Sequence, residues 1–252
     1  MKTVLITGAT SGIGEAFAKY YSKKGYRLIL TGRNRKRLKW YKNHLKGVQK
    51  VIPADLTRKA DCKKLLLETR KEPVDIFINN AGFGLFGEFL KTDLNNELSM
   101  IQVNDVAMHQ LFKVMLRRME RRGEGTILNV ASSAGLLPAG PYMATYYATK
   151  AYVVSLTKAV AAELKASGSR VYVAALCPGP VDTGFHQVAG VKFSSTGISA
   201  SQCVKEAVKG MKKKKCVIVP GKGLAIWMKF QKLVPERILL FIIAAFQKSK
   251  EK

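Results

Sequence analysis

The stretch TVLITGATSGIG, residues 3–14, decides the fold of this chain. Its first five residues are β-branched or apolar and predict a short buried strand. The segment EAFAKYYSKKG that follows has the apolar spacing of a helix and ends on a glycine. Gly8, Gly12 and Gly14 therefore lie in a turn between a strand and a helix.

This turn has the chemistry of a phosphate site. Glycine allows the tight turn and a close backbone approach, and a helix N-terminus offers N–H groups and a positive dipole end to a pyrophosphate. The spacing is G-x3-G-x-G rather than the common G-x-G-x-x-G. Because the turn opens a βαβ unit, it predicts nucleotide binding, with Thr10, Ser11 and Ile13 beside the three glycines.

Strand and helix patterns alternate along the rest of the chain. Further strands are predicted at 26–32, 48–56, 74–82, 125–133, 170–183 and 216–221, with helical segments between them. Alternating β and α elements indicate an α/β fold with a doubly wound parallel sheet, about seven strands, and helices on both faces. No linker or repeat divides the 252 residues, so we expect one Rossmann-type domain, 1–252.

The end of the second predicted strand indicates which dinucleotide is bound. In such folds an acidic residue roughly 20 residues past the glycine turn binds the ribose 2′-OH of NAD. No acidic residue stands between Glu15 and Asp55, and the strand ends in Arg33, with Arg35 and Arg37 behind it. Guanidinium groups match a 2′-phosphate, so the sequence favours NADP(H). A merely solvated basic helix explains Arg33 less well.

Two later strand ends add candidate cofactor contacts. The Asp55 carboxylate, or the N–H of Leu56, is placed to meet the adenine edge, but Asp55 serves equally well as the N-cap of a helix from about Arg58. The fourth strand runs to the carboxyl edge of the sheet, where open α/β sheets bind ligands. Three residues there are expected to contact the cofactor: Asn80, Ala81 and Gly82.

The second half brings hydroxyl and amine side chains to the same edge. Asn104 lies inside a predicted helix, 95–122, where an amide is unfavourable unless it is used; a structural hydrogen bond is the simpler reading. The fifth strand ends in Ser132 and Ser133. In YMATYYATK, residues 142–150, Tyr146 and Lys150 are four apart and share one helix face. The sixth strand breaks at PGP, 178–180.

Six motifs now stand in order: TGATSGIG at 7–14, NNAG at 79–82, Asn104, Ser133, Tyr146-x-x-x-Lys150 and PGPVDT at 178–183. Together they make residues 1–190 resemble a short-chain dehydrogenase/reductase. The TGR segment resembles the NADPH-preferring branch. The basic, apolar C-terminus resembles the bacterial group named for DltE.

The resemblance implies a catalytic role for each residue. Lys150 would lower the pKa of Tyr146 and bind the nicotinamide ribose, and Tyr146 would exchange a proton with a carbonyl oxygen. The family keeps its serine thirteen residues before the tyrosine, which selects Ser133 over Ser132 to hold that oxygen. Asn104 would carry a water linked to Lys150.

The resemblance also implies contacts to the nicotinamide. The carboxamide would be fixed by the Val181 backbone and Thr183, in the turn that begins with Pro178 and Gly179. The implied activity is an NADP(H)-dependent oxidoreductase that interconverts a ketone or aldehyde and an alcohol. The alternative is a non-catalytic NADP(H)-sensing or scaffold protein on the same fold.

The substrate region is expected to be apolar. In this family residues 184–200 close over substrate, and here they are rich in glycine and serine. We expect Phe83, Tyr142 and Phe185 to line the substrate pocket with Ser133. Tyr147 is expected to point elsewhere and pack, and His186 to lie on the surface. A hydrophobic carbonyl substrate follows, steroid-, acyl- or lipid-like.

The C-terminal extension, 221–252, contains the uninterrupted apolar run 238–246, which is too short to span a bilayer. Such a run should be buried. It can pack over the substrate pocket, at a subunit interface or on a membrane surface; of these we favour the interface.

The formal net charge is +26, from 43 Lys and Arg against 17 Asp and Glu. This excess suggests nucleic acid or an anionic membrane as a partner, or simply a lysine-rich surface. We expect no nucleic acid, because Trp40 and Tyr41 have the spacing to pack on the sheet. We expect a homodimer or homotetramer through helices 95–122 and 146–166, with peripheral membrane contact left open.

The cysteines predict the compartment. Cys62, Cys177, Cys203 and Cys216 are scattered, without CxxC or metal-ligand spacing. They predict free thiols in a cytoplasmic protein and no metal site.

Overall fold

The computed structural model describes residues 1–183, 189 and 197–248. The predicted substrate lid, with Phe185 and His186, therefore falls mostly outside the described residues.

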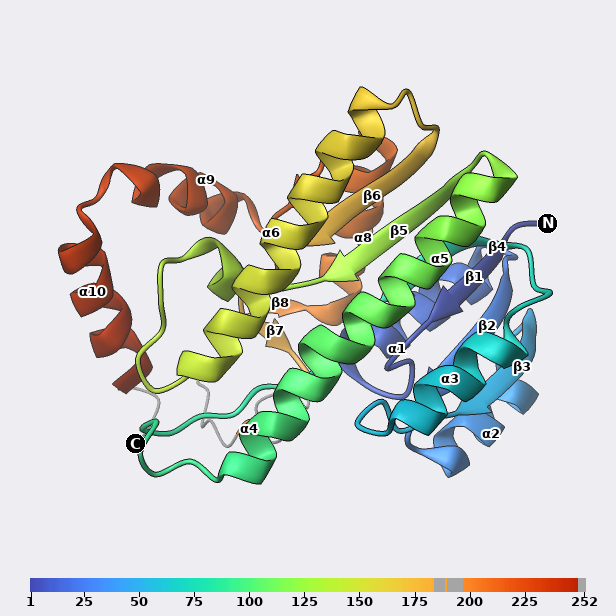
Figure 1. Cartoon of the computed structure of the whole chain (residues 1–252), viewed down its shortest axis with the longest axis horizontal. Coiled ribbons are helices and arrows are strands. Elements are labelled where there is room, and N and C mark those ends of the chain that lie inside the picture. The colour runs from blue at the N-terminus through green and yellow to red at the C-terminus, as the bar shows by residue number, and fades with distance from the viewer. Residues whose placement is uncertain (184–188, 190–196, 249–252) are drawn as a thin grey trace.

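A parallel sheet forms the centre of the fold, as predicted (Figure 1). Its strand order is β3-β2-β1-β4-β5-β6-β9, so the order reverses between β1 and β4, the switch point at which doubly wound sheets bind ligands. The seven strands are β1 Thr3–Ile6, β2 Arg27–Gly32, β3 Val48–Pro53, β4 Val74–Asn79, β5 Gly125–Val130, β6 Val171–Leu176 and β9 Val217–Ile218. A separate parallel pair joins β7 Val181–Asp182 to β8 Ile198–Ser199.

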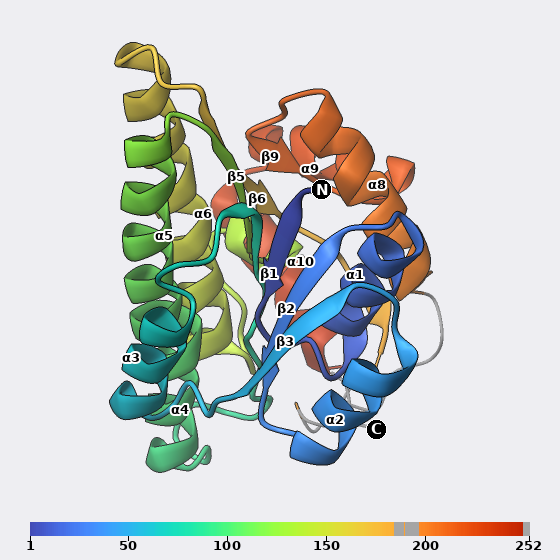
Figure 2. The same cartoon turned by 90° about the vertical axis from the view of Figure 1, so that its right-hand side faces the viewer.

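Helices cover both faces of this sheet (Figure 2). One face packs on α3 Lys59–Glu68, α5 Met108–Arg122 and α6 Ala144–Ala166. The other packs on α1 Gly12–Lys23, α2 Arg35–His44 and α8 Ala200–Lys212. The strands are buried on both faces, which is why they read as continuous apolar runs in the sequence.

The predicted helix 95–122 is three segments in the structure. α4, Leu94–Ile101, passes through a π-helical turn, Gln102–Ala107, into α5. Asn104 lies in this wider turn and is buried. π-Helical turns are rare and occur often at functional sites. The interruption of the helix therefore indicates that the backbone around Asn104 is shaped to place this side chain.

The aromatic pair of α2 divides between core and surface. Tyr41 is fully buried in the core, as expected, whereas Trp40 is 43% exposed and stacks on His44. The prediction that both pack on the sheet is therefore wrong for Trp40. The four cysteines all carry free thiols, as predicted.

A C-terminal pair of helices, α9 Lys222–Phe230 and α10 Glu236–Lys248, lies at one end of the molecule beyond α6 (Figure 1). Between them a short 3₁₀ turn, Gln231–Leu233, is fastened by Gln231, whose Nε2 donates to the Leu136 carbonyl at 3.0 Å. Within the described ranges no helix is long and apolar enough to cross a membrane.

Candidate active site

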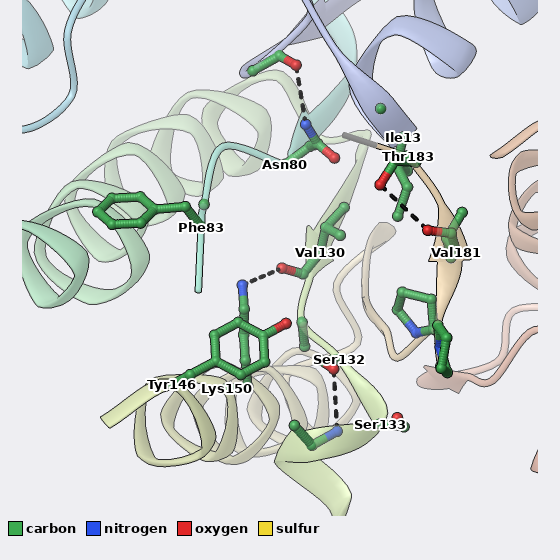
Figure 3. A pocket seen from close by; sticks show the side chains of 18 of the residues that line it. Ile13, Asn80, Phe83, Val130, Ser132, Ser133, Tyr146, Lys150, Val181 and Thr183 are labelled. Carbon is green, nitrogen blue, oxygen red and sulfur yellow. Dashed lines mark hydrogen bonds between the residues drawn. The ribbon is translucent and has the colours of Figure 1, made fainter. Parts of the chain in front are cut away.

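A cavity of about 660 Å³ lies along the carboxyl edge of the sheet, and Figure 3 shows part of its lining around Tyr146 and Lys150. Residues of α9 and α10 also line it. Most of the predicted cofactor residues line it: Gly8, Thr10, Ser11, Gly12, Ile13, Arg33, Asp55, Leu56, Asn80, Ala81, Gly82, Tyr146, Lys150, Pro178, Gly179, Val181 and Thr183. Ser133 and Phe83 line it as well. Gly14, Asn104 and Tyr142 are not among the lining residues.

Gly14 acts by letting the N-terminus of α1 approach the turn. A Cβ at Gly14 would lie 2.2 Å from the Gly8 carbonyl oxygen, a distance that real atoms do not adopt. Gly8 itself has φ +63°, and Asn80 holds the turn to β4 through a 2.8 Å bond from its Nδ2 to the Thr7 carbonyl. The first N–H groups of α1 therefore face the cavity from a fixed turn, as a pyrophosphate site requires.

Only one of the three arginines Arg33, Arg35 and Arg37 lines the cavity. Arg33 does so, whereas Arg37 donates to Glu15 at 2.7 Å and to the Tyr41 hydroxyl at 3.1 Å. The expectation that Arg37 stands behind Arg33 for a 2′-phosphate is not supported, because Glu15 already neutralises it. Arg35 is also absent from the lining among the residues described.

Asp55 is not a helix cap. Its Oδ1 accepts from the N–H and the hydroxyl of Thr57, at 3.1 and 2.8 Å, while α3 has Arg58 at its N-cap position. Burial raises the pKa of the Asp55 carboxyl, but the Thr57 hydrogen bonds and the Arg33 charge outweigh this and leave it below the usual value. Of the two alternatives for Asp55, the N-cap is excluded.

Ser132, rather than Ser133, is the serine that hydrogen-bonds to Tyr146. The Ser132 hydroxyl also accepts from the Ala134 N–H at 3.1 Å, and Figure 3 shows it between the Tyr146 ring and the start of the following helix. Ser133 begins a 3₁₀ helix, and its N–H donates to the Pro178 carbonyl at 2.8 Å. The structure thus pairs Tyr146 with Ser132, fourteen residues before it, and not with Ser133 as the resemblance implied. The catalytic role of Ser132 stays a prediction.

Burial dominates the titration of the Tyr146 and Lys150 pair. It raises the pKa of Tyr146 to about 12, against the hydrogen bond with Ser132. It lowers the pKa of Lys150 to about 8, against the charge of Asp105. Lys150 Nζ lies 5.7 Å from the centre of the Tyr146 ring and donates to the Val130 carbonyl at 3.2 Å. The expected lowering of the Tyr146 pKa by Lys150 is therefore absent in this structure.

Asn104 supports the site with its amide. Its Nδ2 donates to the Phe83 carbonyl at 2.9 Å and to the Thr149 hydroxyl at 3.1 Å, and its Oδ1 accepts from the Phe83 N–H. Gly82 leaves room for this arrangement, since a Cβ there would lie 2.9 Å from Asn104 Oδ1 and 3.2 Å from Lys150 Nζ. The structural hydrogen bond predicted for Asn104 is confirmed.

Asp105 is a charged neighbour of this site that sequence reasoning missed. Its Oδ1 is buried and has no hydrogen-bond partner within the described part of the chain. Burial raises the pKa of Asp105 to about 6, opposed by the charge of Lys150. The sequence could have indicated Asp105, because it stands directly after Asn104 among apolar residues of a helix. Burying a carboxylate there has a high desolvation cost, so such a residue is expected to have a role.

The outer part of the cavity is apolar and comes from residues far apart in the sequence. Its walls include Leu137, Met143, Tyr147, Leu224, Trp227, Met228, Leu239, Ile242, Ile243 and Phe246. The expectation that Tyr147 points away is wrong: it lines the cavity, and Gln247 Nε2 donates to its hydroxyl at 2.6 Å. Tyr142, expected in the pocket, instead has φ 65° and stacks on Phe86, with ring centres 6.1 Å apart.

The predicted apolar run 238–246 forms most of α10. Leu239 and Ile243 are buried against a cluster that contains Met143, Tyr146 and Tyr147. The inner side of the run therefore packs over the cavity, which was one of the three alternatives. The subunit interface that we favoured stays a prediction. No cluster of His, Cys, Asp and Glu that suits a metal ion occurs in the part of the chain described.

Known oxidoreductases are similar to this chain in sequence. The short chain dehydrogenase family matches residues 2–192. An uncharacterized oxidoreductase of Staphylococcus epidermidis is 32% identical over 209 residues, which cover 82% of this chain and 89% of that protein.

Two solved structures are also similar. A short-chain dehydrogenase from Sphingobium yanoikuyae in complex with NADPH is 31% identical, with a TM-score of 0.84 over 92% of this chain and 93% of that one. A bulky-bulky ketone specific alcohol dehydrogenase from Comamonas testosteroni is 27% identical, with a TM-score of 0.79 over 92% of each chain. This chain belongs to the short chain dehydrogenase family.

Proposed function

We propose that this oxidoreductase is an NADPH-dependent carbonyl reductase. The observation that carries the proposal is one continuous cavity that joins Arg33 and the α1 N-terminus to the Tyr146, Ser132 and Lys150 side chains. The glycine turn, the arginine and the buried tyrosine all fit an NADPH whose nicotinamide end lies beside Tyr146. When bound, the cofactor supplies a hydride to the carbonyl carbon.

The chain's own residues perform the proton chemistry. Ser132 donates a hydrogen bond to the carbonyl oxygen, where negative charge develops as the hydride arrives. Tyr146 then gives that oxygen its proton, so that ketone, NADPH and one proton become alcohol and NADP⁺. Burial raises the pKa of Tyr146 to about 12, so the phenol is protonated at neutral pH and holds the proton that the carbonyl oxygen requires. The Lys150 ammonium would hold the nicotinamide ribose of the bound cofactor, as the family resemblance implies.

We further propose that the substrate is hydrophobic. Ring and branched side chains from the loop after β5, α6, α9 and α10 surround the space beyond Tyr146. The solved relative from Comamonas testosteroni, named for bulky ketones, is consistent with such a pocket. The competing proposal, a non-catalytic NADP(H) sensor, has the same cofactor site but requires no proton donor. The hydrogen bond between the half-buried Ser132 and the buried Tyr146, beside Lys150, favours the enzyme.

Self-association is proposed through the outer face of α4 to α6. Leu98, Val106 and Tyr152 are exposed there, and the Tyr152 hydroxyl lies 2.6 Å from His109 Nδ1, linking α6 to α5.

We expect sedimentation velocity to give a dimer or tetramer that Val106→Glu dissociates, because burying a carboxylate in an apolar contact is costly. Leu67→Glu, on exposed α3, is the matched control. A monomeric wild type would contradict the proposal.

Replacing each serine in turn tests the correction at the active site. Ser132→Ala should lower kcat for ketone reduction roughly 100- to 1,000-fold, because it removes a donor to the developing oxyanion. Ser133→Ala should stay within a few-fold of wild type. Equal losses in both variants, or loss in Ser133→Ala alone, would restore the spacing-based choice. Full turnover by Tyr146→Phe would favour the non-catalytic alternative.

The Arg33 guanidinium should decide cofactor preference. Arg33→Ala should raise KM for NADPH roughly 10- to 100-fold, the loss expected for hydrogen bonds to a charged phosphate, and leave KM for NADH nearly unchanged. Initial rates with both cofactors measure this, with Arg35→Ala as the control. If wild type used NADH as well as NADPH, the cofactor proposal would be wrong.

Asp105 should set the upper pH limit of reduction. The protonated form of Lys150 is needed, and its pKa is about 8, held up by the Asp105 carboxylate. Asp105→Asn removes that charge, lowers the pKa of Lys150 further and moves the basic limb of the kcat/KM profile to lower pH. Asp105→Glu keeps the charge and should leave the limb in place. If the basic limb of the kcat/KM profile did not move in Asp105→Asn, the coupling between Asp105 and Lys150 would be refuted.

A further inference from the structure

The C-terminal helices expose an apolar surface that the monomer does not need for its own core. We name it the C-terminal apolar face. Its exposed members are Ile226, Trp227, Phe230, Leu233, Ile238, Phe241, Ile242 and Phe246. Phe241 is 75% exposed, and Leu233 is 80% exposed. Soluble monomers rarely display so many large apolar side chains on two adjoining helices, so the face indicates an interaction site.

α10 is apolar on two sides, and only one of them is used inside the molecule. Leu239, Ile243 and Gln247, spaced by four, point inward and are buried. Ile238, Phe241 and Ile242 are exposed, at the i, i+3, i+4 spacing of a second stripe, and of these three only Ile242 also lines the cavity. Packing in the core explains the first stripe, whereas Ile238 and Phe241 of the second stay exposed and indicate a partner outside the monomer.

This face continues into the cavity. Trp227, Ile242 and Phe246 are exposed and also line the cavity wall. They stand where the apolar outer half of the cavity meets the surface of α9 and α10. A molecule resting on the face would therefore meet the route by which an apolar substrate enters.

The charges around the face indicate what the partner is. Between residues 222 and 248 the basic residues are Lys222, Lys229, Lys232, Arg237 and Lys248, and the only acid is Glu236. A second copy would bring a like-charged rim against this one, which is unfavourable. An anionic bilayer attracts each Lys or Arg and accepts the aromatic and aliphatic side chains at its interface. α10, with 13 residues, is too short to span a bilayer, so it would lie along the surface.

We propose that the C-terminal apolar face docks on an anionic lipid bilayer and opens the cavity toward it, so that the substrate is a carbonyl compound dissolved in lipid. The docking proposal rests on the exposed apolar face and the basic residues around it, and it does not depend on the reductase function. The substrate class rests on the proposed reductase function.

Vesicle flotation tests the docking without any turnover. Full-length protein should float with phosphatidylglycerol/phosphatidylcholine vesicles, lose binding as salt rises, and bind phosphatidylcholine vesicles far more weakly. Ile238→Glu/Phe241→Glu should weaken flotation at least roughly tenfold, because two charges replace apolar contacts on the outer stripe. Neither residue lines the cavity.

The matched control is Phe89→Glu/Leu90→Glu, which changes two exposed apolar residues outside α9 and α10; Leu90 is 95% exposed. This control should float like wild type. Wild-type protein that stays off anionic vesicles, or a C-terminal variant that floats as well as wild type, overturns the proposal. So does a C-terminal variant that turns a dimer into a monomer while wild type ignores vesicles, since a second copy would then cover the face.

Tryptophan fluorescence reports the orientation and remains informative if the glutamate variant misfolds. The chain has two tryptophans, Trp40 and Trp227. In Trp40→Phe, emission from Trp227 should shift to the blue on anionic vesicles and be quenched by brominated lipid. In Trp227→Phe, emission from Trp40 on α2 should be unaffected. Quenching of Trp40 alone would place the membrane contact on another face and overturn the proposal.

Activity assays separate this proposal from the proposed function. With a long-chain ketone held in anionic vesicles, Ile238→Glu/Phe241→Glu should lose most of its rate, whereas with a short water-soluble ketone it should match wild type. Equal rates of variant and wild type on the vesicle-borne ketone overturn the proposed delivery from lipid. Absence of turnover on every ketone, together with intact flotation, refutes the reductase function and leaves the docking supported.

Discussion

The close approach of α1 to the turn after β1 is the constraint on which the site depends. Helix and turn are so near at Gly14 that no side chain fits between it and the Gly8 carbonyl. Asn80 fastens the same turn to β4 across the switch point of the sheet. The parallel strands of the seven-stranded sheet bring their carboxyl ends to this edge, so the glycine turn and the Tyr146 and Lys150 side chains line one cavity.

Burial then decides the chemistry of that cavity. The Tyr146 and Lys150 side chains are both buried, and desolvation favours the neutral form of each. It therefore raises the pKa of the phenol and lowers the pKa of the ammonium group. Ser132 and Asp105 partly oppose these shifts. The expectation from the sequence considered only the attraction between a cation and a phenolate, and it omitted the larger cost of removing both from water.

The C-terminal helices cover the outer part of the cavity with one side and expose an apolar surface on the other. Leu239 and Ile243 close the outer cavity, while Phe241 on the opposite side of the same helix faces outward. An all-round apolar run cannot reveal which side is used, because both sides carry the same residue types. The tertiary contacts assign one side to the core and leave the other for the proposed docking.

The sequence by itself indicated the parallel sheet and the glycine turn between β1 and α1, because strand alternation and glycine spacing are local properties of the chain. It also singled out Tyr146, since this tyrosine stands four residues before Lys150 and follows a serine-ended strand at the carboxyl edge. Only the tertiary structure decided between Ser132 and its neighbour, because one extra loop residue changes which hydroxyl reaches the tyrosine. Which helices enclose the substrate was likewise settled by packing between segments far apart in the chain, a contact that no local pattern encodes.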